Sequence, residues 1–256
     1  MKDPKDYNVR AIERAIQILD CFDNDNPSWG LTEIAQEVGL HKATTHRIVT
    51  TLTNHNYLVK SSDGLKYKLG PRLASLGCSV IQQFDIRNVA LPYMKETVQK
   101  FNETCDLSIF DGREILYLEV LQSNHALTIS AAPGKRLPAH CTASGKVFLA
   151  YLSEENFNKF ISQPLKSFTN QTITNPQILK KSLKEIKESG FATDNEEMEL
   201  GIRAIAVPIF NQNGEVIASV SIPGPINRIL DEKIPDFLFA LQQISKNISH
   251  SLGVLR

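Results

Sequence analysis

Residues 31–69 constrain the fold of this chain most, because they place two short helices and a hairpin in immediate succession. The segment begins with LTEIAQEVGL, where apolar residues recur at helical spacing and Gly39 supplies a turn. A polar helix, HKATTHRIVTTLTNH, follows directly. Two short strands near residues 57–60 and 65–69 then flank a turn at Asp63–Gly64. This order predicts a helix-turn-helix with a β-wing.

The second helix separates into two sides at about 100° per residue. One side is built around Ile48, Val49 and Leu52 and must face the domain core. The opposite side carries groups that bind base edges and phosphates, and a small alanine that permits close approach. An isolated polar helix face is usually only solvated, but the wing that follows favours DNA binding. The residues predicted to contact DNA are Lys42, Ala43, Thr44, His46, Arg47 and Thr50, with Lys66 and Lys68 of the wing.

Local charge supports this interpretation, although the whole chain is neutral. It has 28 basic and 28 acidic residues. Residues 40–72 nevertheless hold six basic residues against Asp63 alone, which is the electrostatic pattern of a phosphate-binding surface. The expected partner is therefore double-stranded DNA.

A chain of 256 residues is long enough for two domains with their own cores. No apolar run reaches the roughly 18 residues of a membrane span, and the N-terminus lacks the apolar region of a signal peptide. We therefore expect a cytoplasmic protein with no membrane partner. Its four scattered cysteines, without CxxC spacing, are expected to be buried thiols.

The remaining pattern predicts α+β organisation with an antiparallel sheet. Strands are expected at 105–111, 114–121 and 125–131. Helices are expected near residues 9–22, 86–101, 147–152, 154–162, 176–189 and 231–252. We divide the chain into a winged helix-turn-helix domain at 8–72, a linker helix at 73–84, and an effector-binding and oligomerisation domain at 85–256.

Two strong strands close around Asn213–Gly214, which predicts a two-residue turn with Gln212 opposite Glu215. That register places Ile205 opposite Ile222, Val207 opposite Val220 and Ile209 opposite Ala218 on a bulky core face. The other face pairs Ala204 with Pro223, Ala206 with Ser221 and Pro208 with Ser219. These small side chains leave room for either a packed helix or a ligand, and the sequence alone leaves both open.

Several blocks together resemble the IclR family of bacterial transcription regulators over nearly the full length. They include LTEIAQEVGLHKATTHRIVTTL, GKRLPAHCTASGKVFLAYL, ESGFATDNEEMELGIRAIAVPIF and SVSIPGPINR. The resemblance implies a homodimer or dimer of dimers that binds a pseudo-palindromic operator. It also implies a GAF-like C-terminal domain that senses a small organic acid, and control of a catabolic operon, with repression favoured.

Carried over by position, the resemblance implies an effector site at the start of a helix, where free amides bind anions. Ala204 and Pro223 stand where relatives carry a cysteine and a second serine. We therefore expect a larger or more apolar acid, aromatic or sugar-derived, rather than glyoxylate or pyruvate. The implied effector residues are Ala143, Ser144, Asp194, Ile202, Ala204, Ser221 and Pro223.

Two alternative sites are weaker. His140 and Cys141 are adjacent in sequence, so their side chains point apart and do not favour a catalytic pair. The acidic run from Asp194 to Glu199 is more typical of a solvated face than of a metal site. We predict no catalytic residue, metal or cofactor. An enzyme that retains a winged helix and a protein–protein adaptor are the rival functions.

Overall fold

The computed structural model of this chain describes residues 9–23, 26–83, 85–126 and 128–251. Its contacts divide it into two compact units, Met1–Gln83 and Phe84–Arg256, and each is described by itself. Among the described residues, no helix combines the length and apolar character needed to cross a bilayer.

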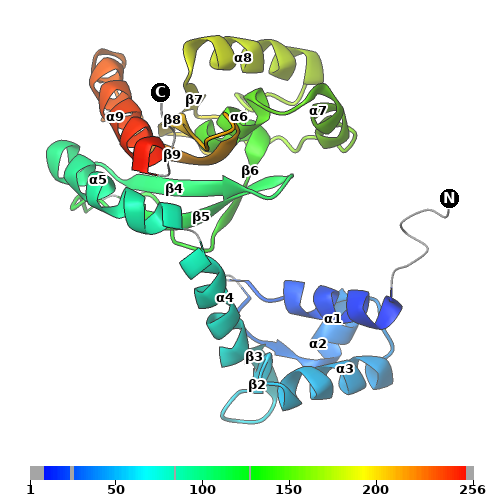
Figure 1. Cartoon of the computed structure of the whole chain (residues 1–256). Helices are drawn as coiled ribbons and strands as arrows, with labels where there is room; N and C mark the ends of the chain where they lie inside the picture. Colours follow the sequence, from blue (N-terminus) through cyan, green and yellow to red (C-terminus); the bar gives the residue numbers. More distant parts are fainter. Residues whose placement is uncertain (1–8, 24–25, 84, 127, 252–256) are drawn as a thin grey trace. The chain divides into compact units, whose positions relative to one another are not determined.

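The N-terminal unit packs α1, α2 and α3 against a small antiparallel sheet of order β1-β3-β2 (Figure 1). Its core includes Ile18, Ile34, Val49 and Leu58, all fully buried. The two-residue strand β1, which the sequence pattern did not reveal, pairs with β3. The elements are α1 (Arg10–Asp20), β1 (Trp29–Gly30), α2 (Leu31–Glu37), α3 (Lys42–Asn54), β2 (Leu58–Lys60), β3 (Lys66–Leu69) and α4 (Pro71–Gln83).

A capping hydrogen bond, a glycine and a turn hydrogen bond define the start of α2 and the turn that leads to α3. The amide of Gly30 donates to Glu33 Oε2 over 2.6 Å, which caps the start of α2. Gly39 adopts φ +63°, a left-handed conformation that suits glycine, and ends the helix. The amide of Leu40 then donates to Ala35 O over 2.9 Å. The predicted helix-turn-helix and its wing are confirmed.

The C-terminal unit is built on a sheet of order β6-β5-β4-β9-β8-β7, in which every neighbouring pair is antiparallel. This confirms the α+β class. The strands are β4 (Cys105–Phe110), β5 (Glu114–Leu121), β6 (Arg136–Pro138), β7 (Ala192–Asn195), β8 (Ile202–Phe210) and β9 (Val216–Pro225). The helices are α5 (Asp85–Phe101), η2 (Ala139–Cys141), α6 (Ala143–Ala150), α7 (Glu154–Ile161), α8 (Pro176–Ser189), η3 (Asp231–Lys233) and α9 (Ile234–Ser251).

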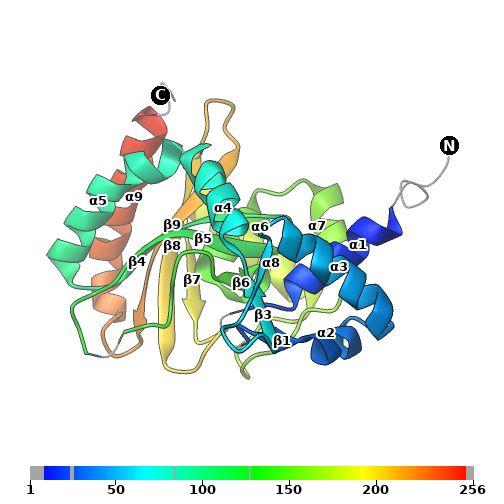
Figure 2. The same cartoon turned by 90° about the horizontal axis from the view of Figure 1, so that it is seen from below.

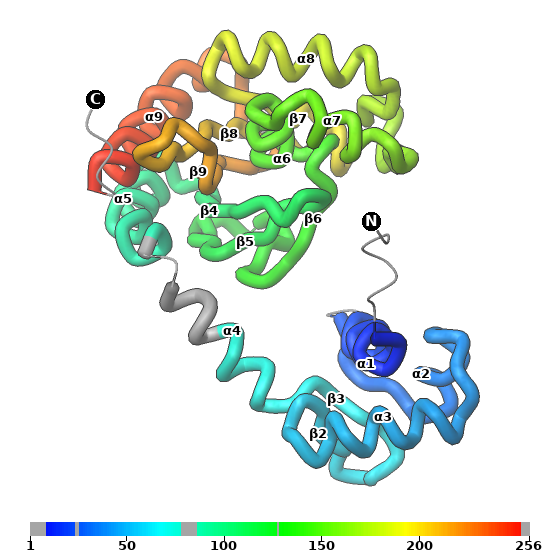
Figure 3. The backbone as a smooth tube through the Cα atoms, turned by 45° about the vertical axis from the view of Figure 1, so that its right-hand side comes forward, coloured from blue at the N-terminus to red at the C-terminus, as the bar shows by residue number. Residues whose placement is uncertain are grey.

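Helices cover both faces of this sheet (Figure 2). The bulky face of β8 and β9 is buried under α5 and α9, which lie side by side (Figure 3). Phe101 of α5 meets Phe237 of α9 edge to face, with ring centroids 4.9 Å apart. The small-residue face lies under α6 and α8, where Ala204 and Ala206 join a second core.

The register of the β8–β9 hairpin is as expected, but its turn is not. Ala204 pairs with Pro223 and Ala206 with Ser221. The turn, however, closes between Asn211 and Glu215, and the predicted pairing of Gln212 with Glu215 is wrong. Asn211 Oδ1 accepts from both Asn213 N and Glu215 N, which holds a longer loop. A bulge between Ile209 and Phe210 then restores the expected register.

The predicted strand at 125–131 is also wrong for the described residues of that segment. Two of its carbonyl groups accept hydrogen bonds from side chains, where a strand would have bonded to its neighbour. Gln122 Nε2 donates to Ala131 O over 2.8 Å, and Lys135 Nζ donates to Ser130 O over 2.5 Å. β6 (Arg136–Pro138) takes the place beside β5 that this strand would have needed.

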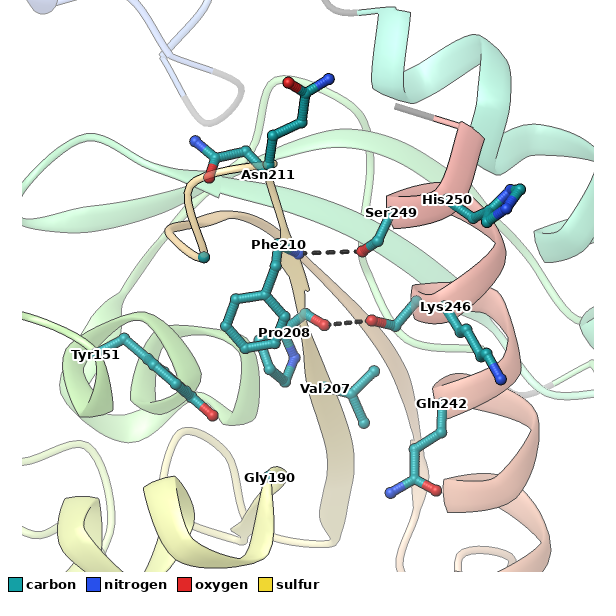
Figure 4. Close-up of a pocket in the computed structure, with 13 residues that line it drawn as sticks. Tyr151, Gly190, Val207, Pro208, Phe210, Asn211, Gln242, Lys246, Ser249 and His250 are labelled. Atoms are coloured by element: carbon teal, nitrogen blue, oxygen red, sulfur yellow. Dashed lines mark hydrogen bonds between the residues drawn. The ribbon is translucent and has the colours of Figure 1, made fainter. Parts of the chain in front are cut away.

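The last part of β8 is completed by a helix. β7 pairs with β8 only as far as Ala206, so residues 207–210 have no strand on that side. Pro208 has no amide hydrogen, and its carbonyl accepts from Ser245 Oγ of α9 over 2.5 Å. The amide of Phe210 donates to Ser249 Oγ over 3.3 Å, as Figure 4 shows. Serine side chains of α9 thus bind two backbone groups of β8 beyond the end of its pairing with β7.

Candidate functional site

The first candidate site is the outer surface of α3. Thr45 and Val49 are buried in the core, which turns the other side of the helix to solvent. The side chains predicted to contact DNA are exposed, apart from Thr44, which is half-buried. They are Lys42, Ala43, His46, Arg47 and Thr50.

The wing adds exposed cations beside this helix. Lys66 and Lys68 are both exposed on β3, on either side of the buried Tyr67. Lys66 Nζ lies 3.8 Å from Glu33 Oε2, so one of the predicted DNA contacts is already restrained by a carboxylate. The exposure of that pair keeps its contribution below about 1 kcal/mol.

A groove of about 300 Å³ lies between α1 and α3 and is lined by both Arg14 and Arg47. The sequence pattern of α1 indicates only an apolar stripe, so it does not point to Arg14. A second guanidinium beside Arg47 extends the basic surface onto another helix.

The second candidate site is a cavity of about 90 Å³ in the C-terminal unit. It lies where the small-residue face of the sheet runs past the start of α6. A helix packs on one part of this face and a cavity adjoins another, so the bound ligand stays a prediction. The predicted residues that line it are Ala143, Asp194, Ile202, Ala204 and Pro223.

Two predicted effector residues lie outside this lining. Ser221 Oγ donates to Asp106 Oδ2 over 2.7 Å, because β9 and β4 place these residues directly opposite each other. Ser144 is buried in the first turn of α6, and its hydroxyl has no hydrogen-bond partner within the described part of the chain. The Ser221 hydroxyl thus donates its hydrogen bond to a neighbouring strand, and its role toward an effector stays a prediction.

The cavity wall also contains residues that sequence reasoning missed. Tyr117 comes from β5, and Met198 and Glu199 come from the loop after β7. The irregular segment that replaces the expected third strand supplies a further wall. Because these contacts depend on long-range packing, no local pattern identifies them. The remaining lining residues are Ile129, Ser130, Ala131, Lys135, Leu137 and Thr142.

Asp194 is the most perturbed acid of the cavity. Burial raises the pKa of its carboxyl to about 7, and the hydrogen bond from the amide of Glu197 opposes part of that shift. This bond measures 2.8 Å to Asp194 Oδ1. Near neutral pH the carboxyl is therefore partly protonated and able to donate a hydrogen bond to an anion.

The loop of residues 196–201 covers the cavity and is firmly attached. Lys146 of α6 forms a buried ion pair with Glu197. Thr172 Oγ1 donates to Glu197 O over 2.6 Å, and Thr169 Oγ1 donates to Glu196 O over 2.6 Å. The loop is thus fastened to α6 on one side and to the segment before α8 on the other.

The start of α6 has the geometry of an anion site. Thr142 caps the helix, with its hydroxyl accepting from Gly145 N over 3.2 Å. The other amides of a first helical turn lack acceptors within their own helix, and Ala143 lines the cavity at this point. An acid bound here would meet amide dipoles and the protonated form of Asp194.

The two weaker sites acquire definite structural positions. His140 Nε2 lies 2.8 Å from Lys166 O, and burial lowers the pKa of its ring. Cys141 Sγ lies 3.5 Å from Met198 Sδ, and burial raises the pKa of its thiol to about 12. Within the described residues, no three His, Cys, Asp or Glu side chains converge to hold a metal ion. Cys105 is buried as expected, whereas Cys21 is only half-buried.

A separate groove of about 320 Å³ runs between α9 and the end of β8 (Figure 4). Tyr151 and Phe210 meet edge to face on one wall, with ring centroids 5.3 Å apart. Gln242, Lys246 and His250 of α9 form the other wall. None of the predicted effector residues lines this groove.

Comparison with known proteins matches both parts of the chain to the same family. Residues 11–62 match the IclR helix-turn-helix domain, and residues 78–250 match the bacterial transcriptional regulator IclR C-terminal model. The HTH-type transcriptional regulator XynR of Escherichia coli is 35% identical over 96% of this chain and 98% of its own. The transcriptional repressor IclR of the same organism is 30% identical over 99% of this chain and 93% of its own.

Among solved structures, an IclR homolog complexed with 4-hydroxybenzoate from Microbacterium hydrocarbonoxydans superimposes with a TM-score of 0.82. It is 28% identical and covers 94% of this chain and 98% of its own. The family models together span most of the chain, and the relatives named here are similar from end to end. The chain therefore belongs to the IclR family and is an IclR-type transcriptional regulator.

Proposed function

We propose that this regulator binds double-stranded operator DNA through the exposed side of α3 and its wing. The observation that carries the proposal is the exposed row of donors on α3, backed by a core that fixes the orientation of the helix. Lys42 and Arg47 suit phosphate and guanine, and Arg14 of α1 lies beside Arg47. We add Arg14 to the proposed DNA contacts.

Arg47→Ala tests this surface. Fluorescence anisotropy on DNA from upstream of the gene, over a salt series, is expected to show a loss of about 1–3 kcal/mol. If Arg47 contacts phosphate only, binding weakens equally on all sequences. The slope of log affinity against log salt concentration then falls by about one in magnitude, because one counterion fewer is released. Lys181→Ala, on α8 of the other unit, is the matched control and should bind as the native protein does. Normal operator binding by a folded Arg47→Ala protein would refute the proposed surface.

We also propose that the cavity binds a small organic acid whose carboxylate meets the start of α6. The partly protonated Asp194 supports an acidic ligand, since an ionised carboxylate there would repel it. The related structure that holds 4-hydroxybenzoate supports a carboxylic acid as the class of ligand. Ala204 and Pro223 offer no side-chain hydrogen bond, which favours an aromatic or sugar-derived acid over a two- or three-carbon acid.

The volume of the cavity sets a condition on that ligand. About 90 Å³ is below the several hundred cubic ångströms of typical ligand pockets. A larger acid can therefore bind only if part of the cavity wall moves outward. The segment around Ile129–Ala131 is the candidate, because side-chain bonds from Gln122 and Lys135 hold it instead of a strand ladder.

Titration calorimetry with aromatic, keto and sugar acids tests the effector site. One acid of the larger classes is expected to bind, and Ala204→Leu, which fills the cavity, should abolish that binding. Leu230→Ala, at an exposed position away from the cavity, serves as the control. Micromolar binding of glyoxylate or pyruvate would contradict the proposed class. Binding that survives Ala204→Leu would contradict the proposed location.

We propose finally that the regulator acts as a homodimer or dimer of dimers and represses a catabolic operon. Paired winged helices would read a pseudo-palindromic operator, and effector binding would alter their separation. Analytical ultracentrifugation gives the assembly state. A transcription assay with the effector tests the direction, and a fall in operon expression on deleting the gene would contradict repression.

A further inference from the structure

The tip of the wing carries a leucine in full contact with solvent. Leu65 is 75% exposed, the highest value among the exposed large apolar side chains of the described residues. Side chains alternate along a strand, so Leu65 falls on the same side of the hairpin as Tyr67, whose ring is buried in the domain core. Leu65 itself comes one residue before β3 begins. Leu65 therefore continues the apolar side of the hairpin past the core that would have covered it.

Hydrogen bonds fix the turn that presents this side chain. Gly64 N donates to Ser61 O over 2.9 Å, and Leu65 N donates to Asp63 Oδ1 over 2.9 Å. Ser61 Oγ donates to the same carboxylate over 2.5 Å. The Ser61 hydroxyl and the Leu65 amide lower the pKa of Asp63, so the carboxylate that organises the turn is ionised at neutral pH. Leu65 is thus held on an ordered turn.

Exposed cations lie on the two strands joined by this turn. Lys60, Lys66 and Lys68 are all exposed on the two strands of the wing. An apolar tip on a hairpin with exposed cations suits the minor groove of DNA, where phosphates line both rims and sugar and base edges line the interior. The same unit carries the exposed donors of α3, so the wing and the helix are available to one duplex.

We infer that Leu65 enters the minor groove beside the major groove occupied by α3 and acts as an apolar wedge. Leucine is among the side chains that proteins insert between base steps to unstack and kink a duplex. The cost of unstacking is smallest at flexible pyrimidine–purine steps, so the wedge selects a sequence that it does not read by hydrogen bonds. This inference rests on the proposed DNA-binding function and adds a second means of sequence selection to it.

The test begins with duplexes selected from a random library by the full-length protein. Leu65→Ala is then compared with the native protein for affinity, for bending by fluorescence energy transfer, and for unstacking with 2-aminopurine at the step facing the wing. We expect about a tenfold loss of affinity for selected duplexes, a smaller bend and a weaker preference for the flexible step. Affinity for random DNA and the salt slope should stay unchanged, because no phosphate contact is removed.

Two further variants separate the possible results. Leu65→Met, which keeps a long apolar side chain, should restore bending. Ile178→Ala, an exposed apolar position on α8, should leave every DNA measurement unchanged. Unaltered bending and step preference in folded Leu65→Ala would overturn the inference. So would a change in its oligomeric mass without DNA, since that would place the leucine in a protein interface. Failure of the native protein to select any sequence would instead refute the proposed function itself.

Discussion

The buried ion pair between Lys146 and Glu197 leads to a quantitative prediction. Their side chains are 4% and 8% exposed, and the second oxygen of Glu197 has no hydrogen-bond partner within the described residues. Lys146→Met would leave a buried carboxylate without its counter-charge. Removing one partner of a buried pair costs about 3–5 kcal/mol, because the remaining charge keeps its desolvation penalty.

An exposed pair in the same unit provides the control. Lys180 and Glu154 are 59% and 74% exposed, so Lys180→Met should cost less than about 1 kcal/mol. The double variant Lys146→Met/Glu197→Leu should recover most of the loss, because two apolar side chains of similar volume replace both charges. A double-mutant cycle then isolates the coupling between the two residues.

Urea unfolding followed by circular dichroism measures these differences. The chain has one tryptophan, Trp29, which lies in the N-terminal unit. Its fluorescence therefore reports a transition that Lys146→Met should leave unmoved, and this separates the two units in the same sample. A cost for Lys146→Met as small as that for Lys180→Met would show that water reaches the pair and would refute the reasoning.

Three other changes have definite expected outcomes. Burial raises the pKa of Asp106 from 3.8 to about 7, so the free energy of unfolding falls as pH rises between these values. Asp106→Asn should therefore raise the free energy of unfolding by up to about 4 kcal/mol at pH 8 and by almost nothing at pH 4. An equal gain at both pH values would contradict this. Gly145→Ala should abolish folding of the C-terminal unit, since its Cβ would lie 2.2 Å from Ala139 O, and a native circular dichroism spectrum would disprove that clash. Affinity for the acid effector should fall as pH rises through about 7, where Asp194 loses its proton, and calorimetry on Asp194→Asn should show a flatter pH profile.

Local patterns predicted most of the regular structure. The polar and apolar sides of α3 follow from helical spacing, and the same spacing places Arg47 outside and Val49 inside. The predicted register of the hairpin is correct although the predicted turn is not, because the bulky residues of β8 and β9 share one buried face. The bulge at Ile209 is the adjustment that reconciles the two. Burial of a face thus determined the register more strongly than the turn sequence did.

The cavity was only partly predictable for a different reason. Ala204 and Pro223 could be placed on one face from strand alternation alone. Tyr117 reaches the cavity from β5 and Met198 from the loop after β7, and nothing in their own neighbourhoods signals this. The resemblance could not reveal that Asp106 stands opposite Ser221 on β4 and accepts a hydrogen bond from its hydroxyl.

The serines of α9 that complete the edge of β8 have a consequence for synthesis on the ribosome. Ser245 and Ser249 belong to α9 and are translated after every strand of the C-terminal sheet. Until they emerge, the Pro208 carbonyl and the Phe210 amide are unpaired on a sheet edge, which is the surface through which chains pair wrongly. A chain whose strands have formed before α9 docks therefore exposes this edge to wrong pairing.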